Sequence, residues 1–201
     1  MAQPIPLRTL LQQGFRALMT GDEMYALARY PTTAFGESPR NSDQSFLVIR
    51  ADTVEAKDWL LATYIDSLPS LDRRALLVTA NTRVHLLGHA LLASAVRPPN
   101  LRQGYLEDED WHRVSSLIQR IRGVELSLMI KGRRGAEAFS QHIEQHVRES
   151  ATQVLLIDEP SRCFPQRRQD AGMSSEGVPA AILALAGTVL SQIIVVTSDV
   201  S

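Results

Sequence analysis

One lysine in the first third of the chain stands where a protein could contact phosphate groups. Lys57 follows the apolar run Phe46–Ile49 and a short turn, and a segment of helical character comes after it. A phosphate-binding loop has this order and reads G-x-x-x-x-G-K-[ST]. Its glycines let backbone amides face the phosphates, its lysine contacts the outer phosphates, and its hydroxyl holds magnesium. The eight corresponding positions, 51–58, read Ala-Asp-Thr-Val-Glu-Ala-Lys-Asp.

The residues around Lys57 depart from that pattern. Alanine replaces both glycines, and alanine resists the positive φ angles that glycine adopts readily. Asp58 replaces the hydroxyl, and Asp52 and Glu55 bring the number of nearby carboxylates to three. Three carboxylates beside one lysine repel a polyphosphate. By itself the stretch is interpreted as an ordinary exposed turn before an amphipathic helix.

A second stretch places acidic residues at the end of an apolar run. Val154–Ile157 leads into Asp158 and Glu159, which matches a Walker B strand. In such a strand the aspartate supports magnesium, and a nearby acid can polarise the attacking water. A buried strand that ends in acidic residues is also common for structural reasons. Lys57, Asp158 and Glu159 are therefore the nucleotide-binding candidates, in a degenerate form of the site.

Two loops that follow apolar runs are rich in basic residues. Their members are Lys131, Arg133, Arg134, Arg162, Arg167 and Arg168. Loops beyond the carboxyl ends of parallel strands are where ligands bind in open α/β sheets. These residues form a candidate surface for nucleic acid or for a protein partner, and solvated loop charge is the alternative.

Histidine and cysteine predict neither a metal site nor a nucleophile. The pairs His85/His89 and His142/His146 have a spacing that can chelate a metal from one helix face. Neither pair has a cysteine or carboxylate at typical ligand spacing, so we interpret them as ordinary helix positions. Cys163 is the only cysteine, which rules out an intramolecular disulfide framework, and it has no histidine partner in sequence.

Length and composition predict one domain with a substantial core. The 201 residues are 44% hydrophobic and 21% charged, and the formal net charge of −1 gives no global basic field for nucleic acid. The N-terminus lacks the pattern of a signal peptide, and no apolar run reaches the ~18 residues that span a bilayer. We therefore expect a cytoplasmic protein.

Strand-length apolar runs alternate with segments of helical spacing. The expected strands are residues 46–49, 75–79, 125–130, 154–157 and 193–197, and the expected helices are residues 7–18, 59–68, 83–95, 107–122, 136–150 and 180–190. Continuously apolar strands are typical of a parallel sheet covered by helices on both faces. Residues 1–45 are expected to form a short helical arm and a linker, because Pro31, Gly36 and Pro39 interrupt its later part.

The segment Leu91–Trp111 resembles a known family. It contains Leu-Ala-Ser at positions 92–94, Arg-Gln-Gly-Tyr-Leu at 102–106 and Glu-Asp-Glu-Asp-Trp at 107–111. DnaB-family replicative DNA helicases carry a similar helix ending in L-A-S, followed by R-x-G-x-L and an acidic helix start. The resemblance extends from Phe46 to the C-terminus through the order of the elements. It implies a RecA-like ATPase core, which in relatives forms a hexameric ring on single-stranded DNA.

Measured against that resemblance, most of the catalytic pattern is replaced. Lys57 and Asp158 match family positions, but the family's catalytic glutamate corresponds to Asn81, whose amide cannot act as a general base. Ser198-Asp199 stands where the family has serine-glutamine. The later strands, which in relatives carry DNA-contacting loops and the arginine finger, are not found, so we expect a truncated domain.

These observations predict a RecA-like three-layer α/β fold with a mostly parallel central sheet, formed by residues 46–201, and a helical arm in residues 1–45. The expected function is that of a pseudo-ATPase without a cofactor, a structural or regulatory subunit of a larger assembly. Its partner would be a helicase, another multi-subunit machine or a second copy of the chain. One alternative is a divergent ATPase that uses ATP and magnesium; another is a DNA-binding accessory module without nucleotide.

Overall fold

The computed structural model describes residues 5–7, 9, 11–12, 46–51, 53–68, 73–81, 84–93, 95–96, 106–165, 177–186 and 188–198. Strands and helices alternate along these residues. The strands are β1 (Ile5–Pro6), β2 (Phe46–Ala51), β3 (Ala75–Thr79), β4 (Leu126–Ile130), β5 (Val154–Asp158) and β6 (Gln192–Ser198). The helices are α3 (Val54–Ser67), α4 (Val84–Ala93), α6 (Asp108–Ile121), α7 (Ala136–Glu149), α8 (Pro160–Cys163) and α9 (Ala180–Leu183).

The strands form one six-stranded sheet in the order β1-β4-β3-β5-β6-β2. All neighbours pair in parallel except β1, which is antiparallel to β4. Parallel strands must be joined by crossovers, and the helices between them supply these connections. The carboxyl ends of β2 to β6 therefore lie at one edge of the sheet, and their amino ends lie at the other.

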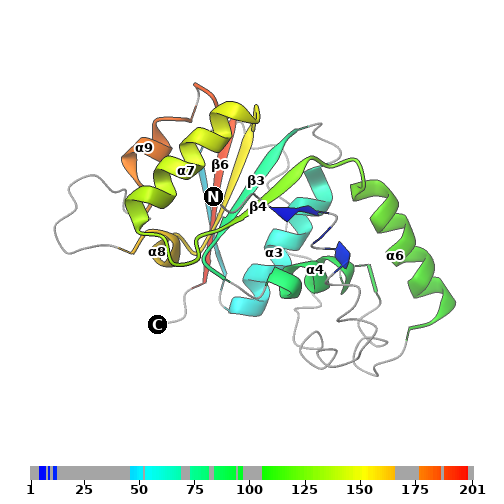
Figure 1. Cartoon of the computed structure of the whole chain (residues 1–201). Coiled ribbons are helices and arrows are strands. Elements are labelled where there is room, and N and C mark those ends of the chain that lie inside the picture. The colour runs from blue at the N-terminus through cyan, green and yellow to red at the C-terminus, as the bar shows by residue number, and fades with distance from the viewer. Residues whose placement is uncertain are drawn as a thin grey trace.

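Helices cover both faces of the sheet (Figure 1). One hydrophobic core lies between the sheet and α3, α4 and α6, and it includes Leu61, Leu91 and Leu117. A second core lies between the opposite face and α7, α8 and α9, and it includes Phe139 and Ile182. Alternate residues of β5 point into the two cores, as expected for a strand buried on both faces. The predicted three-layer α/β fold with a mostly parallel sheet is confirmed.

Helix α3 begins five residues before the predicted start at position 59. Thr53 precedes it with extended backbone angles (φ −140°, ψ 162°), and its Oγ1 accepts a hydrogen bond of 3.1 Å from the Ala56 N–H. A threonine in this position is a favourable N-cap. As a result, residues 54–58 of the loop-like stretch form the first turn of a helix, and Lys57 lies in that turn.

The C-terminal helix is shorter than predicted. Helix α9 ends at Leu183, whereas the sequence predicted a helix to position 190. Glycine at position 187 and the β-branched Thr188 and Val189 lower the helix propensity of the later part. The short α8 was not predicted. Residues 166–176, between α8 and α9, lie outside the described residues.

The described part of the N-terminal arm packs on the domain. The backbone is helical at the described positions 7, 9, 11 and 12, and the rest of the predicted helix and the linker lie outside the described residues. Strand β1, which was not predicted, pairs Ile5 with Leu128 and covers one edge of β4. Leu7 is buried in the first core. No helix within the described part of the chain is long and apolar enough to cross a membrane.

Candidate functional site

The sheet order brings Lys57 and Asp158 together at the carboxyl edge, although 101 positions separate them in sequence. Lys57 lies in the first turn of α3, and Asp158 is the last residue of β5. Thr79 is the last residue of β3 and stands beside Asp158 in the parallel register. Two candidates inferred from separate motifs therefore belong to one cluster.

Lys57 is directed into the protein and paired with two carboxylates. Its Nζ donates a short hydrogen bond to Oδ1 of Asp158 and lies 3.2 Å from Oδ1 of Asp58. The residue is only 2% exposed. Burial alone would lower the pKa of Lys57, but the carboxylates of Asp158 and Asp58 outweigh this effect and raise the pKa above its usual value. The ammonium therefore stays charged as part of a buried network.

The second oxygen of Asp158 is also occupied. Oδ2 accepts a hydrogen bond of 2.6 Å from the Thr79 hydroxyl, whose oxygen accepts one of 2.9 Å from the Asn81 N–H. The space lined by Asp58, Thr79, Asn81, Asp158 and four leucines is about 10 Å³. That volume holds about one water molecule. We name Lys57, Asp58, Thr79 and Asp158 the lysine cluster.

Backbone groups at the start of α3 are bonded within the chain as well. The Ala56 N–H donates to the Thr53 side chain at 3.1 Å, and the Lys57 N–H donates to the Thr53 carbonyl at 3.0 Å. In a phosphate-binding loop, amides at this end of the helix point at the ligand. Here Thr53 accepts both hydrogen bonds.

Glu159 points to a different partner from the one that its motif implied. Its carboxylate accepts hydrogen bonds from the Ser198 N–H at 3.1 Å, the Ser198 hydroxyl at 2.5 Å and the Thr197 hydroxyl at 3.3 Å. Its backbone has a φ of 54°, which is unfavourable for a residue with a side chain. Glu159 thus ties the turn after β5 to the end of β6. The Ser198 contact was not predicted, because it depends on β5 and β6 being neighbours.

Cys163 lies close to the same edge and is inert in character. Its thiol is fully buried and donates to the Asp158 carbonyl at 3.2 Å. Burial raises the pKa of Cys163 to about 12, and the nearby Asp158 carboxylate adds to the shift. A reactive cysteine needs a lowered pKa and access to solvent. The thiol of Cys163 is thus a buried group with a raised pKa.

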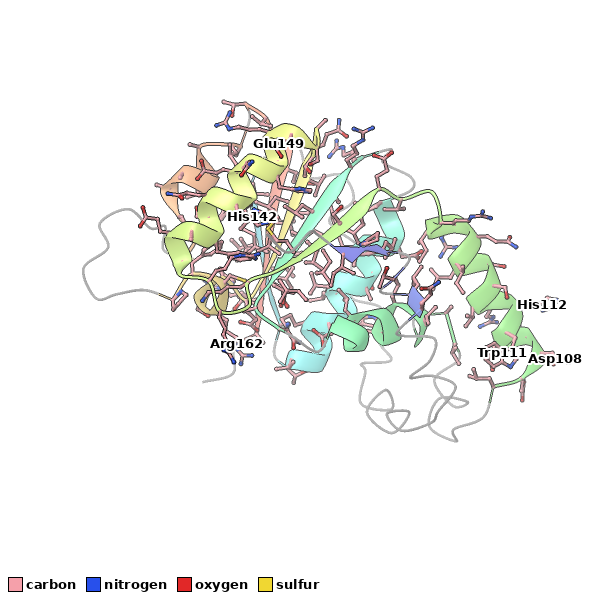
Figure 2. The ribbon with its side chains drawn as sticks, viewed as in Figure 1. Asp108, Trp111, His112, His142, Glu149 and Arg162 are labelled. Atoms are coloured by element: carbon pink, nitrogen blue, oxygen red, sulfur yellow. The ribbon has the colours of Figure 1, made fainter. Side chains whose placement is uncertain are left out.

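The structure brings the two basic loops together. Lys131, after β4, donates through Nζ to the Arg162 carbonyl of α8 at 3.1 Å. Arg133 is exposed, and Arg134 donates to the Ile130 carbonyl at 3.3 Å. Figure 2 shows Arg162 on α8, far from the residues labelled on α6. Arg167 and Arg168 lie outside the described residues.

Of the predicted histidine pairs, the one on α7 can be placed with its side chains. His142 and His146 lie on α7 with Glu149 near its C-terminal end (Figure 2). The side chains of His85 and His89 lie outside the described residues. Within the described ranges, no group of three or more histidine, cysteine, aspartate or glutamate residues is arranged to hold a metal ion.

Comparison with known proteins gives matches in structure but not in sequence. No protein-family model and no curated protein matches this chain. A structure described as a DnaB-like replicative helicase and its interactions with primase is similar over 80% of this chain, with a TM-score of 0.57 and 15% identity. A second structure, described as an ATPase domain, is similar over 92% of this chain, with a TM-score of 0.56 and 15% identity.

These matches concern the fold. The chain spans 40% of the length of the first structure's chain and 70% of the second. At 15% identity the likeness shows a shared architecture, which is the RecA-like fold of helicase ATPase domains. The predicted fold and its similarity to DnaB-like structures are therefore confirmed.

Proposed function

We propose that this protein uses a helicase-like ATPase fold as a binding scaffold, and that it acts without ATP hydrolysis as a structural or regulatory subunit of a larger assembly. The observation that carries the proposal is the lysine cluster. Lys57, which in a phosphate loop would reach the outer phosphates, is turned inward and paired with Asp158 and Asp58. The site supplies its own anions in place of a nucleotide.

A magnesium-bound triphosphate does not fit these residues. To reach Lys57, a phosphate must separate a buried ion pair, and removing one partner of such a pair typically costs about 3–5 kcal/mol. The released carboxylates would then lie beside the phosphates and repel them. Position 58 has no hydroxyl for magnesium, two amides at the start of α3 are bonded to Thr53, and Asn81 stands where the resemblance implies the general base.

A divergent ATPase is the second candidate, and one observation favours it. Lys57 and Asp158 meet at the carboxyl edge, as the lysine and aspartate of a nucleotide site must. Glu159 is the remaining acid of that candidate set, but its carboxylate is bonded to β6. A partner subunit would then have to supply the groups that this chain lacks.

The basic loops support a further role as a DNA-binding accessory module. Lys131, Arg133 and Arg134 follow β4, and Arg162 lies in α8 after β5. Lys131 donates to the Arg162 carbonyl, so the two basic segments meet at the carboxyl edge. Binding of single-stranded DNA through them would weaken steeply with salt and would be lost in the variant Arg133→Ala/Arg134→Ala. If single-stranded DNA does not bind even at low salt, the basic residues would instead contact a protein partner. That partner would be a helicase, another multi-subunit machine or a second copy.

Nucleotide binding and turnover decide between scaffold and enzyme. We would titrate the protein with ATP and magnesium by calorimetry, and measure phosphate release for the parent chain and for Lys57→Ala. The expected result is no saturable binding and no turnover above background in either protein. Turnover by the parent that Lys57→Ala abolishes, in a variant that still unfolds cooperatively, would establish the enzyme instead.

A further inference from the structure

A cleft lies at the edge of the sheet opposite the lysine cluster. It has a volume of about 410 Å³ and is lined by Leu68, Arg73, Arg74, Arg120, Gly123, Val124, Glu125 and Gln153. These residues come from the end of α3, the end of α6 and the segments directly before β3, β4 and β5. Figure 1 shows the amino ends of β3 and β4 beside the end of α6 that leads into the sheet. We name this feature the amino-edge cleft.

Two of the three arginines in the cleft are engaged in exposed ion pairs. Arg74 pairs with Glu125, and both side chains are at least half exposed. Arg120 donates to Oδ1 of Asp66 from Nε at 2.9 Å and from Nη2 at 2.5 Å. Exposed ion pairs contribute little to stability, because water and salt screen them. Either arginine can therefore exchange its present partner for an incoming anion at little cost.

Arg73 differs from its two neighbours. It is half-buried, and no described residue forms an ion pair or hydrogen bond with its guanidinium. Arg73 lies near Tyr64. Burial raises the pKa of Tyr64 to about 12, and the positive charge of Arg73 partly offsets this rise. A guanidinium that is partly removed from water gains from an anionic partner. Among the described residues, the cleft is thus lined by three arginines and the carboxylate of Glu125, and Asp66 pairs with Arg120 beside it.

Apolar surface and open backbone complete the cleft. Val124 is partly buried against the first core and supplies the apolar surface, whereas Leu68 is only 1% exposed. Gly123 has open space where a side chain would stand, so a ligand can approach the backbone there. A ligand that matches these groups carries a negative charge next to an apolar side chain.

The arrangement of charge favours a protein segment over a nucleic acid. Within the described part of the chain, the three arginines outnumber the carboxylates of Glu125 and Asp66 by one, and each carboxylate is paired with an arginine. A run of phosphates would face Asp66 and Glu125 along with the arginines, whereas a single carboxylate needs only Arg73 and one neighbour. We propose that the amino-edge cleft binds an acidic peptide segment of a protein partner, with a glutamate or aspartate on Arg73 and an adjacent apolar side chain against Val124.

The amino-edge cleft lies at the opposite end of the strands from Lys57 and Asp158, so acidic-peptide binding there is a separate activity from the proposed scaffold role. It holds whether or not the lysine cluster admits ATP. Failure of the scaffold proposal would appear as ATP turnover, whereas failure of this one would appear only in peptide binding.

The test uses the full chain and a fluorescein-labelled peptide Gly-Leu-Glu-Leu-Glu-Leu, with the matching glutamine peptide as a control. Binding is followed by fluorescence anisotropy, and the site is located from amide shifts of Gly123 and Val124 in ¹H–¹⁵N spectra. The variant Arg73→Gln removes the charge at the cleft. Arg148→Gln removes an exposed arginine from α7 and serves as the matched control.

We expect the glutamate peptide to bind and to shift both amides, the glutamine peptide to bind at least about tenfold more weakly, and Arg73→Gln to weaken the glutamate peptide about 10- to 100-fold. Arg148→Gln should bind like the parent. Equal binding of the two peptides, no binding, or unchanged affinity in Arg73→Gln would overturn the proposal. So would inorganic phosphate or an oligothymidylate displacing the peptide at lower concentration than unlabelled peptide does.

Discussion

At the scale of single residues, the lysine cluster is a set of buried side chains that pair with one another. Lys57, Asp58, Asp158 and Thr79 satisfy one another in a space that leaves room for about one water. A buried charge is stable only when it is paired and hydrogen-bonded. Each member therefore depends on the others, and this dependence can be measured.

Removing the Lys57 charge should destabilise the fold strongly. The variant Lys57→Met leaves Asp58 and Asp158 without their cation, and we expect the free energy of unfolding to fall by about 3–5 kcal/mol. Adding Asp158→Asn to Lys57→Met should lower the free energy of unfolding by less than Asp158→Asn does in the parent, because the ion pair is already broken. Urea unfolding of the parent, both single variants and the double variant gives the coupling free energy. Additive losses would show that Lys57 and Asp158 do not interact.

The same ion pairs predict a loss of stability at alkaline pH. The folded-state pKa of Lys57 is raised above the usual lysine value of 10.5, so its stabilising contribution is complete below that pH. It is lost as the pH rises through the folded-state pKa, because the ammonium then deprotonates in both states. Between pH 8 and a pH above 11, the free energy of unfolding should therefore decrease more for the parent than for Lys57→Met. Tyr64 also has a raised pKa, but it is present in both proteins and cancels in the comparison. Cys163 does not cancel fully, because the nearby charge of Lys57 lowers the raised pKa of this thiol.

At the scale of elements, the start of α3 decides where Lys57 points. Thr53 caps the helix directly, so the chain enters it without the open loop that a phosphate requires. Glu159 has a related role at the end of β5, where its bonds to Ser198 hold a turn with positive φ. Both motif-bearing turns are closed by hydrogen bonds within the chain.

The cap at Thr53 can be tested by itself. We expect Thr53→Ala to lower the free energy of unfolding by about 1 kcal/mol, because the Ala56 N–H loses its acceptor. Thr53→Ser keeps the hydroxyl and should lie close to the parent. Thermal and urea unfolding of the two variants provide the comparison. Equal stability of the alanine and serine variants would mean that the side-chain cap contributes nothing.

Sequence was sufficient where the information is local. Continuous apolar runs located β3 to the residue and the other parallel strands to within one or two residues. Lys57 and Asp158 were also identified from their motifs. The bond between Thr79 and Asp158 requires knowledge that β3 and β5 are neighbours, which no local pattern contains. The amino-edge cleft was not predicted either, because Arg73 and Arg120 are brought together by the arrangement of β3 and α6 and not by any local pattern.

At the scale of the whole molecule, the sheet separates two edges with different charge chemistry. The carboxyl edge holds the lysine cluster, in which two carboxylates pair with one ammonium, and the basic loops. The amino edge holds the cleft lined by three arginines. In a RecA-like fold the first of these edges is the expected ligand site. Binding at both edges would let a scaffold contact two partners at the same time.

The packing of the N-terminal arm bears on whether the arm and the domain unfold together. Sequence placed residues 1–45 outside the domain, a boundary that stays a prediction, yet Leu7 is 5% exposed and packs in the same core as Leu128. Because this burial links the arm to the sheet, we expect Leu7→Ala to lower the free energy of unfolding of the whole domain by about 2–5 kcal/mol, in one cooperative transition. Matched circular dichroism and tryptophan fluorescence melts measure it, and Leu11→Ala, at a less buried position, should lose less. If the arm were an independent appendage, Leu7→Ala would leave the main transition unchanged, and residues 46–201 alone would unfold at the same temperature as the full chain.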